Sequence, residues 1–454
     1  MSVNVMFWGC QIPARFPFIE KSLRKVFDAL DFRISDVNGF TCCPEKALVG
    51  NMSKDVWTLT AARNLAVARE GAGENLTLIQ ACNGCFSTLK TVQENLDHDP
   101  ALLSKVNDGL NSVNLSYRGG VEVKHIVEMF HDVIGADVIK SQIKRSLNGL
   151  KIAVHPGCHM TRPSSAIDFD DPIVPKKFDS LIRALGGTNI DYHAKMLCCG
   201  GELTNIGDIE KGTDVTRQKL IETRSLEVDA MAVACPNCFK QLDNQQFMMQ
   251  RDGEDFSIPI FYISELIGLT LGIEPKDLGI ESHRVKTERF FERWNEVDES
   301  TGKSAQHFDL VALKACYECG ACLDDCPSAR ILEDYDPKAV MEKVIAGELD
   351  DAVNDHSIWQ CLECHTCTEL CPQGFGMEKV FTTLKKMAGE QGIRPASVEK
   401  GLEMFTKTSR IGEPSMAQRK KLDLPNPPES GFTQWKEMID SIKKTKDEKQ
   451  EGVL

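Results

Sequence analysis

The sequence lacks the segments that would carry a chain into or across a membrane. Its most apolar stretch, residues 261–273, is too short to span a bilayer and contains Glu265. The N-terminus has no basic segment followed by an apolar one, which is the pattern of a secretory signal. We therefore expect no membrane span and a cytoplasmic location. In that compartment thiols stay reduced, and grouped cysteines more often bind metal than form disulfides.

Positive charge is also scarce. The chain of 454 residues has a formal net charge of −14, which argues against a general nucleic-acid binder. Any anionic substrate must be held by a local group of cations, because the net charge of the chain repels it. No glycine-rich nucleotide-binding fingerprint stands out either.

Cysteine, in contrast, is abundant and ordered. The 18 cysteines fall into four motifs with none left over. Two motifs read C-x₃₁-CC-x₃₈-C-x₂-C and C-x₃₉-CC-x₃₅-C-x₂-C, and the other two each read C-x₂-C-x₂-C-x₃-C-P. A cysteine set of this kind predicts iron–sulfur clusters, and with them electron transfer or redox chemistry on sulfur.

The first part of the chain contains an internal repeat. Residues 1–10 and 150–158 each read as an alternating apolar strand followed by Gly and Cys, and residues 75–85 and 227–238 each read as an apolar strand that runs into C-x-x-C. Helix-like stretches separate these strands, which predicts an α/β fold with mostly parallel sheets. Ligands bind beyond the carboxyl ends of such strands. We therefore expect the ten cysteines of the two copies at strand ends, converging on one site.

A polar stretch over residues 281–304 reads as a connector to a third part of the chain. The segment between the two cysteine motifs of this part has a helical pattern, which predicts a helical ferredoxin-like domain. The compact bacterial ferredoxin, with short strands and closely spaced motifs, fits less well. The expected domains are 1–149, 150–290 and 305–392, followed by an extension over 393–454 whose end we expect to be disordered.

The C-x₂-C-x₂-C-x₃-C-P motif is the strongest signal in the chain. Three closely spaced cysteines wrap one [4Fe-4S] cubane, and the fourth, before the proline, ligates the other cluster. A pair of zinc knuckles is the alternative, but zinc usually takes two C-x-x-C pairs far apart. The expected ligands are Cys316, Cys319, Cys322 and Cys371 for one cubane, and Cys361, Cys364, Cys367 and Cys326 for the other.

The five-cysteine motif is less generic. Five thiolates exceed the four that a cubane or a structural zinc ion uses. Adjacent cysteines suit a bridging role, in which one metal centre is held from two sides. On this pattern alone, a zinc site with a spare thiol and a dithiol/disulfide centre stay open as alternatives.

Both five-cysteine motifs resemble the CCG domains of the catalytic B subunit of methanogen heterodisulfide reductase. The CCGGE segment at residues 198–202 matches the signature that names these domains, whereas the first copy has CCP at residues 42–44. The third domain resembles the small iron–sulfur C subunit of that enzyme, which carries two cubanes. The resemblance covers about residues 1–390 and describes a fusion of these two subunits, with the catalytic part first.

The resemblance implies a non-cubane [4Fe-4S] cluster in each five-cysteine motif. It also implies that the mixed disulfide of coenzyme M and coenzyme B is cleaved between the two clusters, with two electrons that arrive through the cubanes. The implied ligands are Cys10, Cys42, Cys43, Cys82 and Cys85 for one cluster, and Cys158, Cys198, Cys199, Cys235 and Cys238 for the other.

In the membrane-bound form of heterodisulfide reductase the cubane domain comes before the CCG pair, whereas here it comes after. By this resemblance the domain order favours the soluble complex of methanogenesis. The implied partner is the flavin-containing, electron-bifurcating A subunit, together with a hydrogenase or formate dehydrogenase module. Flavin is therefore expected on that partner and not on this chain. The alternative is an electron-transfer protein of another CCG-domain oxidoreductase, similar to thiol:fumarate reductase or to glycolate or lactate oxidases, without its own disulfide site.

Contacts to the substrate are predicted from charge and position. The two product thiols would carry a sulfonate and a phosphate, which need nearby cations. Two histidines flank Cys158, where they are placed to donate a hydrogen bond to a cluster or a thiolate. A solvated surface cation or a structural histidine is the alternative at each position. The candidate contacts are His155, His159, Arg162 and Arg15, with Lys140, Lys144 and Arg145 as further cations.

Overall fold

The computed structural model describes residues 3–372, 374–427 and 430–450. The chain divides into two compact units between Glu299 and Ser300. Each unit has its own hydrophobic core, which runs from Val5 to Val297 in the first unit and from Phe308 to Ala388 in the second. Helix α16 (Glu288–Ala305) crosses the division. No helix of the described residues is both long and apolar enough to cross a membrane.

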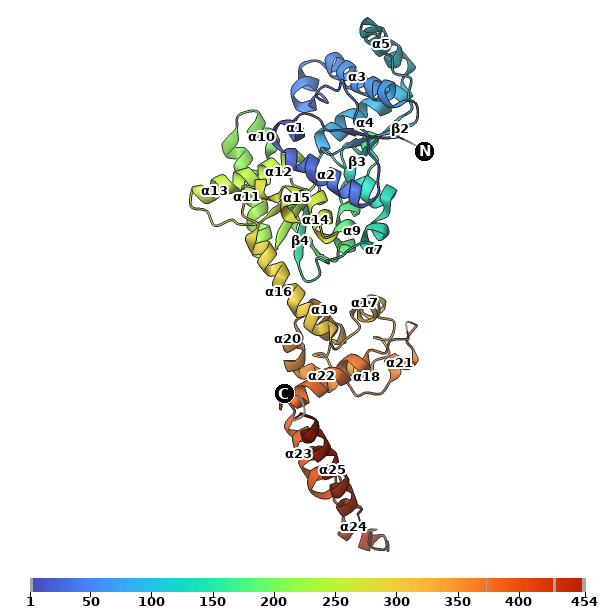
Figure 1. The fold of residues 1–454 in the computed structure, drawn as a ribbon, viewed down its shortest axis with the longest axis vertical. Helices are drawn as coiled ribbons and strands as arrows, with labels where there is room; N and C mark the ends of the chain where they lie inside the picture. The colour runs from blue at the N-terminus through green and yellow to red at the C-terminus, as the bar shows by residue number, and fades with distance from the viewer. Residues whose placement is uncertain (1–2, 373, 428–429, 451–454) are drawn as a thin grey trace. The chain divides into compact units, whose positions relative to one another are not determined.

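Two parallel sheets form the centre of the first unit (Figure 1). The first sheet has the strand order β1-β2-β3 and the second β5-β4-β6-β7. Every strand pair is parallel, so the chain must cross over between neighbouring strands, and helices make these crossovers. The strands are β1 (Val3–Phe7), β2 (Leu76–Gln80), β3 (Val121–His125), β4 (Lys151–His155), β5 (Thr188–Ile190), β6 (Ala230–Val233) and β7 (Ile260–Tyr262).

The two sheets share one arrangement. Strands β2, β6 and β7 are buried along their whole length, as strands covered on both faces are. Beyond β1, Ser35 pairs with Val5 in a parallel bridge, and β5 occupies the same place beside β4. The predicted α/β class is confirmed. Both sheets lie in one compact unit with one core, so the boundary between residues 1–149 and 150–290 stays a prediction.

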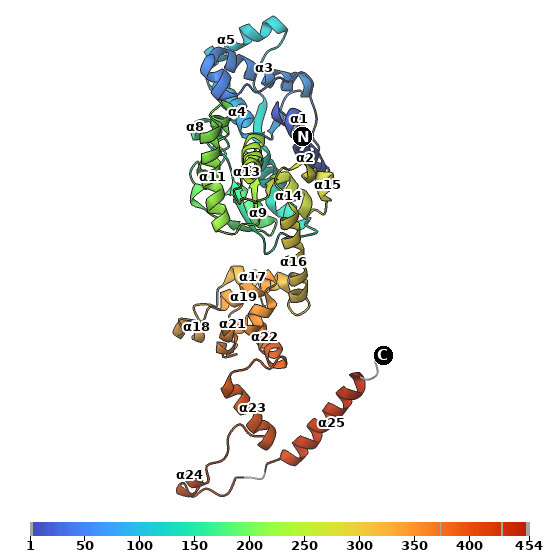
Figure 2. The same ribbon diagram turned by 90° about the vertical axis from the view of Figure 1, so that its left-hand side faces the viewer.

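The two repeats pack tightly where α2 (Pro17–Ala29) meets α14 (Ile263–Thr270), and the two helices lie close together in both views (Figures 1 and 2). The hydroxyls of Ser22 and Ser264 form a buried hydrogen bond of 2.7 Å across this contact. An added Cβ on Gly268 would lie 2.5 Å from a methyl group of Leu278 and 3.2 Å from one of Val26. A larger residue at this position would therefore make these two side chains shift.

Further helices of the first unit connect the strands. The side chain of Ser53 caps α3 by accepting a hydrogen bond from the Val56 N–H. In the first repeat these elements are α1 (Gln11–Arg15), η1 (Lys46–Gly50), α3 (Lys54–Ala72), α4 (Asn83–His98), α5 (Pro100–Leu110), η2 (Asn111–Val113), α6 (Ile126–Glu128), η3 (Met129–Gly135) and α7 (Ala136–Ser141). In the second they are α8 (Ser164–Ile167), α9 (Lys177–Ala184), η4 (His193–Met196), α10 (Gly201–Asn205), α11 (Ile209–Ser225), α12 (Pro236–Phe239), η5 (Lys240–Gln245), α13 (Gln246–Arg251), α15 (Pro275–Leu278) and η6 (Ile280–Ser282).

The second unit is helical, as predicted, and its described residues contain no strand. Of the chain end that we expected to be disordered, the residues up to Gln450 belong to helix α25, and residues 451–454 lie outside the described part. The elements of this unit are α17 (Leu310–Cys319), α18 (Pro327–Ile331), α19 (Pro337–Ala346), α20 (Leu349–Asn354), η7 (His356–Gln360), α21 (Thr366–Glu369), α22 (Glu378–Glu390), α23 (Ala396–Thr408), α24 (Met416–Lys421) and α25 (Phe432–Gln450).

Candidate functional site

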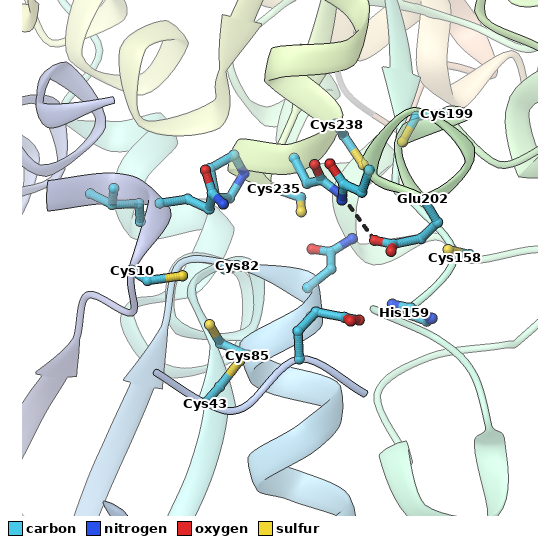
Figure 3. Close-up of a pocket in the computed structure, with 18 of the residues that line it drawn as sticks. Cys10, Cys43, Cys82, Cys85, Cys158, His159, Cys199, Glu202, Cys235 and Cys238 are labelled. Carbon is cyan, nitrogen blue, oxygen red and sulfur yellow. Dashed lines mark hydrogen bonds between the residues drawn. The ribbon is translucent and has the colours of Figure 1, made fainter. Parts of the chain in front are cut away.

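All ten cysteines of the two repeats line one pocket of the first unit, with a cavity volume of about 120 Å³. Figure 3 shows this pocket and labels the cysteines other than Cys42 and Cys198. Six of them follow strands. Cys10 and Cys158 come after β1 and β4, and each C-x-x-C segment begins after β2 or β6 and runs into α4 or α12. Cys82 and Cys235 are the N-caps of these helices, and neither sulfur makes a capping hydrogen bond. The six are Cys10, Cys82, Cys85, Cys158, Cys235 and Cys238.

The adjacent cysteine pairs lie in loops and not at strand ends, which corrects our expectation for these four residues. Cys42 and Cys43 precede η1, and Cys198 and Cys199 lie between η4 and α10. Helices hold both loops through the cysteine backbone. The Asn64 side chain of α3 donates to the carbonyl of Cys42 at 3.0 Å, and in the second repeat a threonine of α11 makes the corresponding contact. Thr216 Oγ1 donates to the carbonyl of Cys199 at 2.9 Å.

A glycine before the first cysteine of each set leaves room for other groups of the pocket. Gly9 and Gly157 have φ angles of +65° and +79°, in the left-handed region that favours glycine. A Cβ on Gly9 would lie 2.9 Å from Cys85 Sγ. One on Gly157 would lie 2.4 Å from Asn83 Nδ2 and 3.3 Å from Cys238 Sγ. The Gly-Cys dipeptide therefore lets β1 and β4 bring their cysteines close to the C-x-x-C turns.

Two buried polar side chains tie the two repeats together at the pocket. The Tyr262 hydroxyl lies between the carbonyls of Ala81 and Ala234, the residues before the first cysteine of each C-x-x-C segment. Its distance to the Ala234 oxygen is 3.0 Å. Asn83 Nδ2 donates to the carbonyl of Pro156 at 2.7 Å. These contacts fix the two cysteine sets relative to each other.

The sulfurs are too close together for all of them to ionise without a cation. Cys42 Sγ lies 3.7 Å from Cys10 Sγ, and hydrogen bonding between these two thiols raises the pKa of Cys10. Hydrogen bonding to Cys235 raises the pKa of Cys82, so proton sharing crosses from one set to the other. Iron in place of protons would let every sulfur carry its charge. A donor set of five thiolates on each side fits an iron–sulfur cluster in each five-cysteine set.

Two carboxylates, Glu45 and Glu202, share the pocket with the cysteines. Glu202 Oε1 accepts a hydrogen bond from Asn237 Nδ2 at 3.1 Å, and Figure 3 shows Glu202 and His159 on the side that carries Cys158. Burial, more than repulsion from Glu45, raises the pKa of Glu202. No lysine or arginine is among the described residues that line the pocket. The wall around the sulfurs is therefore neutral to acidic.

The two candidate histidines occupy different places. His159 lines the pocket. His155 ends β4, is 1% exposed, and has a ring nitrogen within 4.8 Å of the sulfurs of Cys199 and Cys238. Neither ring nitrogen of His155 has a hydrogen-bond partner among the described residues, and burial lowers its pKa to about 3. A neutral imidazole therefore faces the second cysteine set.

Neither candidate arginine lines the pocket. Arg15 is exposed on α1, and Arg162 Nε donates to the carbonyl of Pro172 at 2.9 Å. The pocket lining also lacks Lys140, Lys144 and Arg145. Contact between these cations and a substrate stays a prediction.

Sequence reasoning missed Lys219, a buried lysine of α11. Burial lowers its pKa to about 8, while Cys238 and Cys199 favour its charged form. Its Nζ donates to the carbonyl of Lys195 at 3.3 Å and to that of Ala194. Lys219 lies on the buried face of α11. The helical spacing of that face was the one signal in the sequence, but a lysine is seldom buried and none was expected here.

The second unit brings the other eight cysteines into two groups. The predicted set of Cys326, Cys361, Cys364 and Cys367 lines a cavity of about 20 Å³. In the other set, burial and then the neighbours Cys322, Cys371 and Cys319 raise the pKa of Cys316 to about 11. Backbone N–H groups point at the sulfurs, since Phe375 donates to Cys371 Sγ and Glu378 to Cys367 Sγ, each at 3.3 Å. The group of Cys326, Cys361, Cys364 and Cys367 leaves little space beyond that of its sulfurs.

This arrangement defines the class of protein: an iron–sulfur protein in which a duplicated cysteine-rich α/β domain is joined to a helical dicluster domain. The family model of the cysteine-rich domain matches residues 4–90 and 152–243. The family model of the 4Fe-4S dicluster domain matches residues 312–375. Iron–sulfur clusters of the 4Fe-4S type are therefore the cofactors of this chain.

The relatives define the family more closely. The chain is 33% identical over 294 residues to the B subunit of the ferredoxin/F420H2-dependent CoB-CoM heterodisulfide reductase of Methanosarcina acetivorans, which covers 64% of this chain and 97% of the relative. Its C-terminal part is 40% identical over 99 residues to the C 2 iron-sulfur subunit of the CoB–CoM heterodisulfide reductase of Methanocaldococcus jannaschii, over 22% of this chain and 52% of the relative. The chain belongs to the family of heterodisulfide reductase B subunits and continues into a part similar to the C subunits. The predicted B–C order is confirmed.

A third relative has another activity. The chain is 29% identical over 282 residues to the 8-methylmenaquinol:fumarate reductase membrane anchor subunit of Wolinella succinogenes, over 62% of this chain and 95% of the relative. The similarity of this part of the chain therefore extends to a protein named for a reaction with fumarate.

Proposed function

We propose that this chain reduces the mixed disulfide of coenzyme M and coenzyme B to two thiols, and that it joins the catalytic and the electron-transfer parts of a heterodisulfide reductase in one polypeptide. The observation that carries the proposal is the single pocket to which two repeats contribute five cysteines each. The relatives named as B and C subunits of heterodisulfide reductases support it.

In this proposal each five-cysteine set holds a non-cubane [4Fe-4S] cluster, and each four-cysteine set of the second unit holds a cubane. Bound clusters supply electrons one at a time to a disulfide that needs two, and the protein positions them. The domain limits 1–149, 150–290, 305–392 and 393–454 belong to the same proposal. The ligands are Cys10, Cys42, Cys43, Cys82 and Cys85; Cys158, Cys198, Cys199, Cys235 and Cys238; Cys316, Cys319, Cys322 and Cys371; and Cys361, Cys364, Cys367 and Cys326.

The size and charge of the pocket decide which part of the substrate enters. The cavity of about 120 Å³ would be shared by the clusters and the reacting disulfide, so two whole coenzymes do not fit inside it. The carboxylate of Glu45 repels a sulfonate or phosphate, and none of the described lining residues is a lysine or arginine that would offset it. The anionic ends therefore stay outside. Lys240 is a cation suited to meet one of them, since its Nζ donates to Asn205 Oδ1 of the pocket wall at 2.8 Å.

The products also need protons, because a disulfide that takes two electrons leaves two thiolates. Glu202 is the group placed to hold a proton at the sulfurs of the second set. Burial raises its pKa, and its carboxyl group is held by hydrogen bonds with Asn237 and Asn205. His159 lies on the same side of the pocket (Figure 3).

Electrons reach the pocket from partner proteins in this proposal. The flavin-containing, electron-bifurcating A subunit, with a hydrogenase or formate dehydrogenase module, would reduce the cubanes, and flavin would reside there. The relatives named as C-type subunits of larger reductases support assembly into a hetero-oligomer.

A second candidate function is an electron conduit without a disulfide site, which the similarity to the fumarate reductase anchor protein favours. Two complete five-cysteine sets favour the reductase instead, since a conduit has no need for a matched pair around a cavity. Iron and acid-labile sulfide analysis of the anaerobically purified chain tests the cofactors, with about 16 iron atoms expected from four clusters. Oxidation of a reduced viologen dye by the mixed disulfide then separates the functions: a reductase oxidises the dye, and a conduit does not.

A further inference from the structure

The two cysteine sets lie in unequal surroundings, although the repeats place their sulfurs alike. Phe7 ends β1 and is followed by Trp8, Gly9 and Cys10, whereas His155 ends β4 at the same distance before Gly157 and Cys158. Phe7 is 1% exposed and packs edge-on against Phe40, with ring centroids 5.0 Å apart.

His155 is as deeply buried as Phe7, but it carries two nitrogens that have no partner among the described residues. One nitrogen lies within 4.8 Å of the sulfurs of Cys199 and Cys238. An imidazole has at least one N–H to donate, and the acceptors nearest the ring are these sulfurs and the backbone of Lys195. The second set therefore has a polar ring beside its sulfurs where the first set has a hydrocarbon ring.

The residue after each adjacent cysteine pair also differs between the two sets in whether it can donate a hydrogen bond. Gly200 and Gly201 donate their backbone N–H groups to Cys198 Sγ and Cys199 Sγ, each at 3.4 Å. Pro44 stands at the position of Gly200 in the first repeat and has no N–H to donate. An added Cβ on Gly200 would lie 2.3 Å from the carbonyl oxygen of Gly212, so this loop conformation needs the glycine.

A buried cation adds to the difference. Lys219 is fully buried on α11 and interacts with Cys238, Cys199 and Cys198. The corresponding helix of the first repeat, α3, buries only uncharged residues: Trp57, Thr58, Ala61, Ala62, Asn64, Leu65, Ala66, Val67 and Ala68.

The sulfurs of the first set also have polar surroundings, which come from backbone N–H groups and from water. Backbone N–H groups of Gln11 and Cys43 interact with Cys10 and Cys42, and both of these cysteines are exposed to water. Substrate that covers the pocket removes this water, whereas His155 and Lys219 stay in place behind the second set. Fixed donors in a dry site act more strongly than water does, because their dipoles are already oriented.

We propose that the second site, of Cys158, Cys198, Cys199, Cys235 and Cys238, holds its cluster at a higher reduction potential than the first, and that His155 is the residue that sets this difference. Hydrogen bonds to the sulfurs and a nearby positive charge favour the more negative, reduced form of a cluster and so raise its potential. The first electron delivered to the pocket then resides at the second site. This inference rests on the cluster assignment of the proposed function.

The test is a redox titration of the full chain, followed by paramagnetic resonance, with the parent protein and His155→Phe, which gives the second site the residue of the first. We expect two distinct midpoint potentials in the parent. In the variant we expect the higher midpoint potential to fall by at least about 59 mV. For a one-electron couple this shift is a tenfold drop in the reduced-to-oxidised ratio at a fixed potential. Ser22→Ala removes a buried hydrogen bond outside the pocket lining and is expected to leave both midpoints unchanged.

Two results would overturn the inference: midpoints that stay where they were in His155→Phe with both clusters present, or a shift confined to the lower midpoint. If His155→Phe does not fold, Phe7→His is the deciding variant, and an unchanged lower midpoint would refute the inference. Iron analysis keeps the two proposals apart. A parent protein with its full iron content and equal midpoints refutes only the inequality of the sites, whereas a parent without pocket clusters refutes the proposed function and the inference together.

Discussion

The two units of this chain bind sulfur-rich sites in different ways. In the first, ten cysteines from two α/β repeats surround a shared cavity of about 120 Å³ with polar side chains on its wall. In the second, helices and loops close on four cysteines around a cavity of about 20 Å³. The first cavity is larger and is shared by two cysteine sets, whereas the second is lined by one set. We therefore assign bond cleavage to the first unit and electron transfer to the second.

The largest effect is expected from a ligand of the pocket. Cys199→Ala should lose about four iron atoms per chain and abolish disulfide reduction with a reduced dye, because the cleavage needs a cluster on each side of the disulfide. Iron analysis and the dye assay check this result. Disulfide reduction at the parent rate, with that cluster absent, would refute the paired-cluster mechanism.

A ligand of the second unit should give a different pattern. Cys371→Ala is expected to lose the cluster of Cys316, Cys319 and Cys322, since the cysteine before the proline ligates the other motif. Electron supply from a protein donor then fails, whereas a small dye that reaches the pocket directly still drives reduction. If Cys371→Ala lost disulfide reduction equally with the protein donor and with the dye, the second unit would not be an electron-transfer part separate from the site of cleavage.

Glu202→Gln should lower the rate of disulfide reduction by about 100-fold, the contribution typical of a well-placed proton donor. Because the pKa of Glu202 is raised, the parent rate should fall as the pH rises through that pKa, and the variant should lack this decline. Glu45→Gln is the matched control from the other repeat, whose carboxylate already accepts from the Ala47 and Leu48 N–H groups. A pH–rate profile that is identical in the parent and Glu202→Gln would rule out this role.

The smallest effect is expected between the repeats. Tyr262→Phe removes a hydroxyl that serves a carbonyl in each repeat, and it should lower the free energy of unfolding by about 1–3 kcal/mol. Tyr192→Phe, which removes a hydroxyl bound at 3.1 Å to the carbonyl of Val154 alone, should cost about 1 kcal/mol. Urea unfolding of the cluster-loaded protein measures both. Equal losses would show that Tyr262 does not join the repeats.

The parts that the sequence could predict are those with local periodicity or fixed spacing. Strand patterns before Cys10, Cys82, Cys158 and Cys235 predicted the parallel sheets and the meeting of the two motifs, because parallel strands end at one edge. The helical character of the second unit followed from the segment between its motifs.

The parts that sequence reasoning missed depend on contacts between distant segments. Glu202 was visible in the CCGGE segment, yet its place beside Asn237 depends on the packing of α10 against α12. Tyr262 and Lys219 act through backbone carbonyls far along the chain, and no local pattern marks such partners. The adjacent pairs Cys42–Cys43 and Cys198–Cys199 were expected at strand ends because the loops that hold them have no periodic signal.

In the proposed reaction the pocket binds the two halves of a disulfide at its clusters. Paramagnetic resonance of the oxidised protein with and without coenzyme M and coenzyme B tests this claim most directly. We predict a cluster signal that changes with these thiols and that is lost in Cys199→Ala but kept in Cys371→Ala. A fully iron-loaded protein whose cluster signals do not respond to either thiol would contradict the claim.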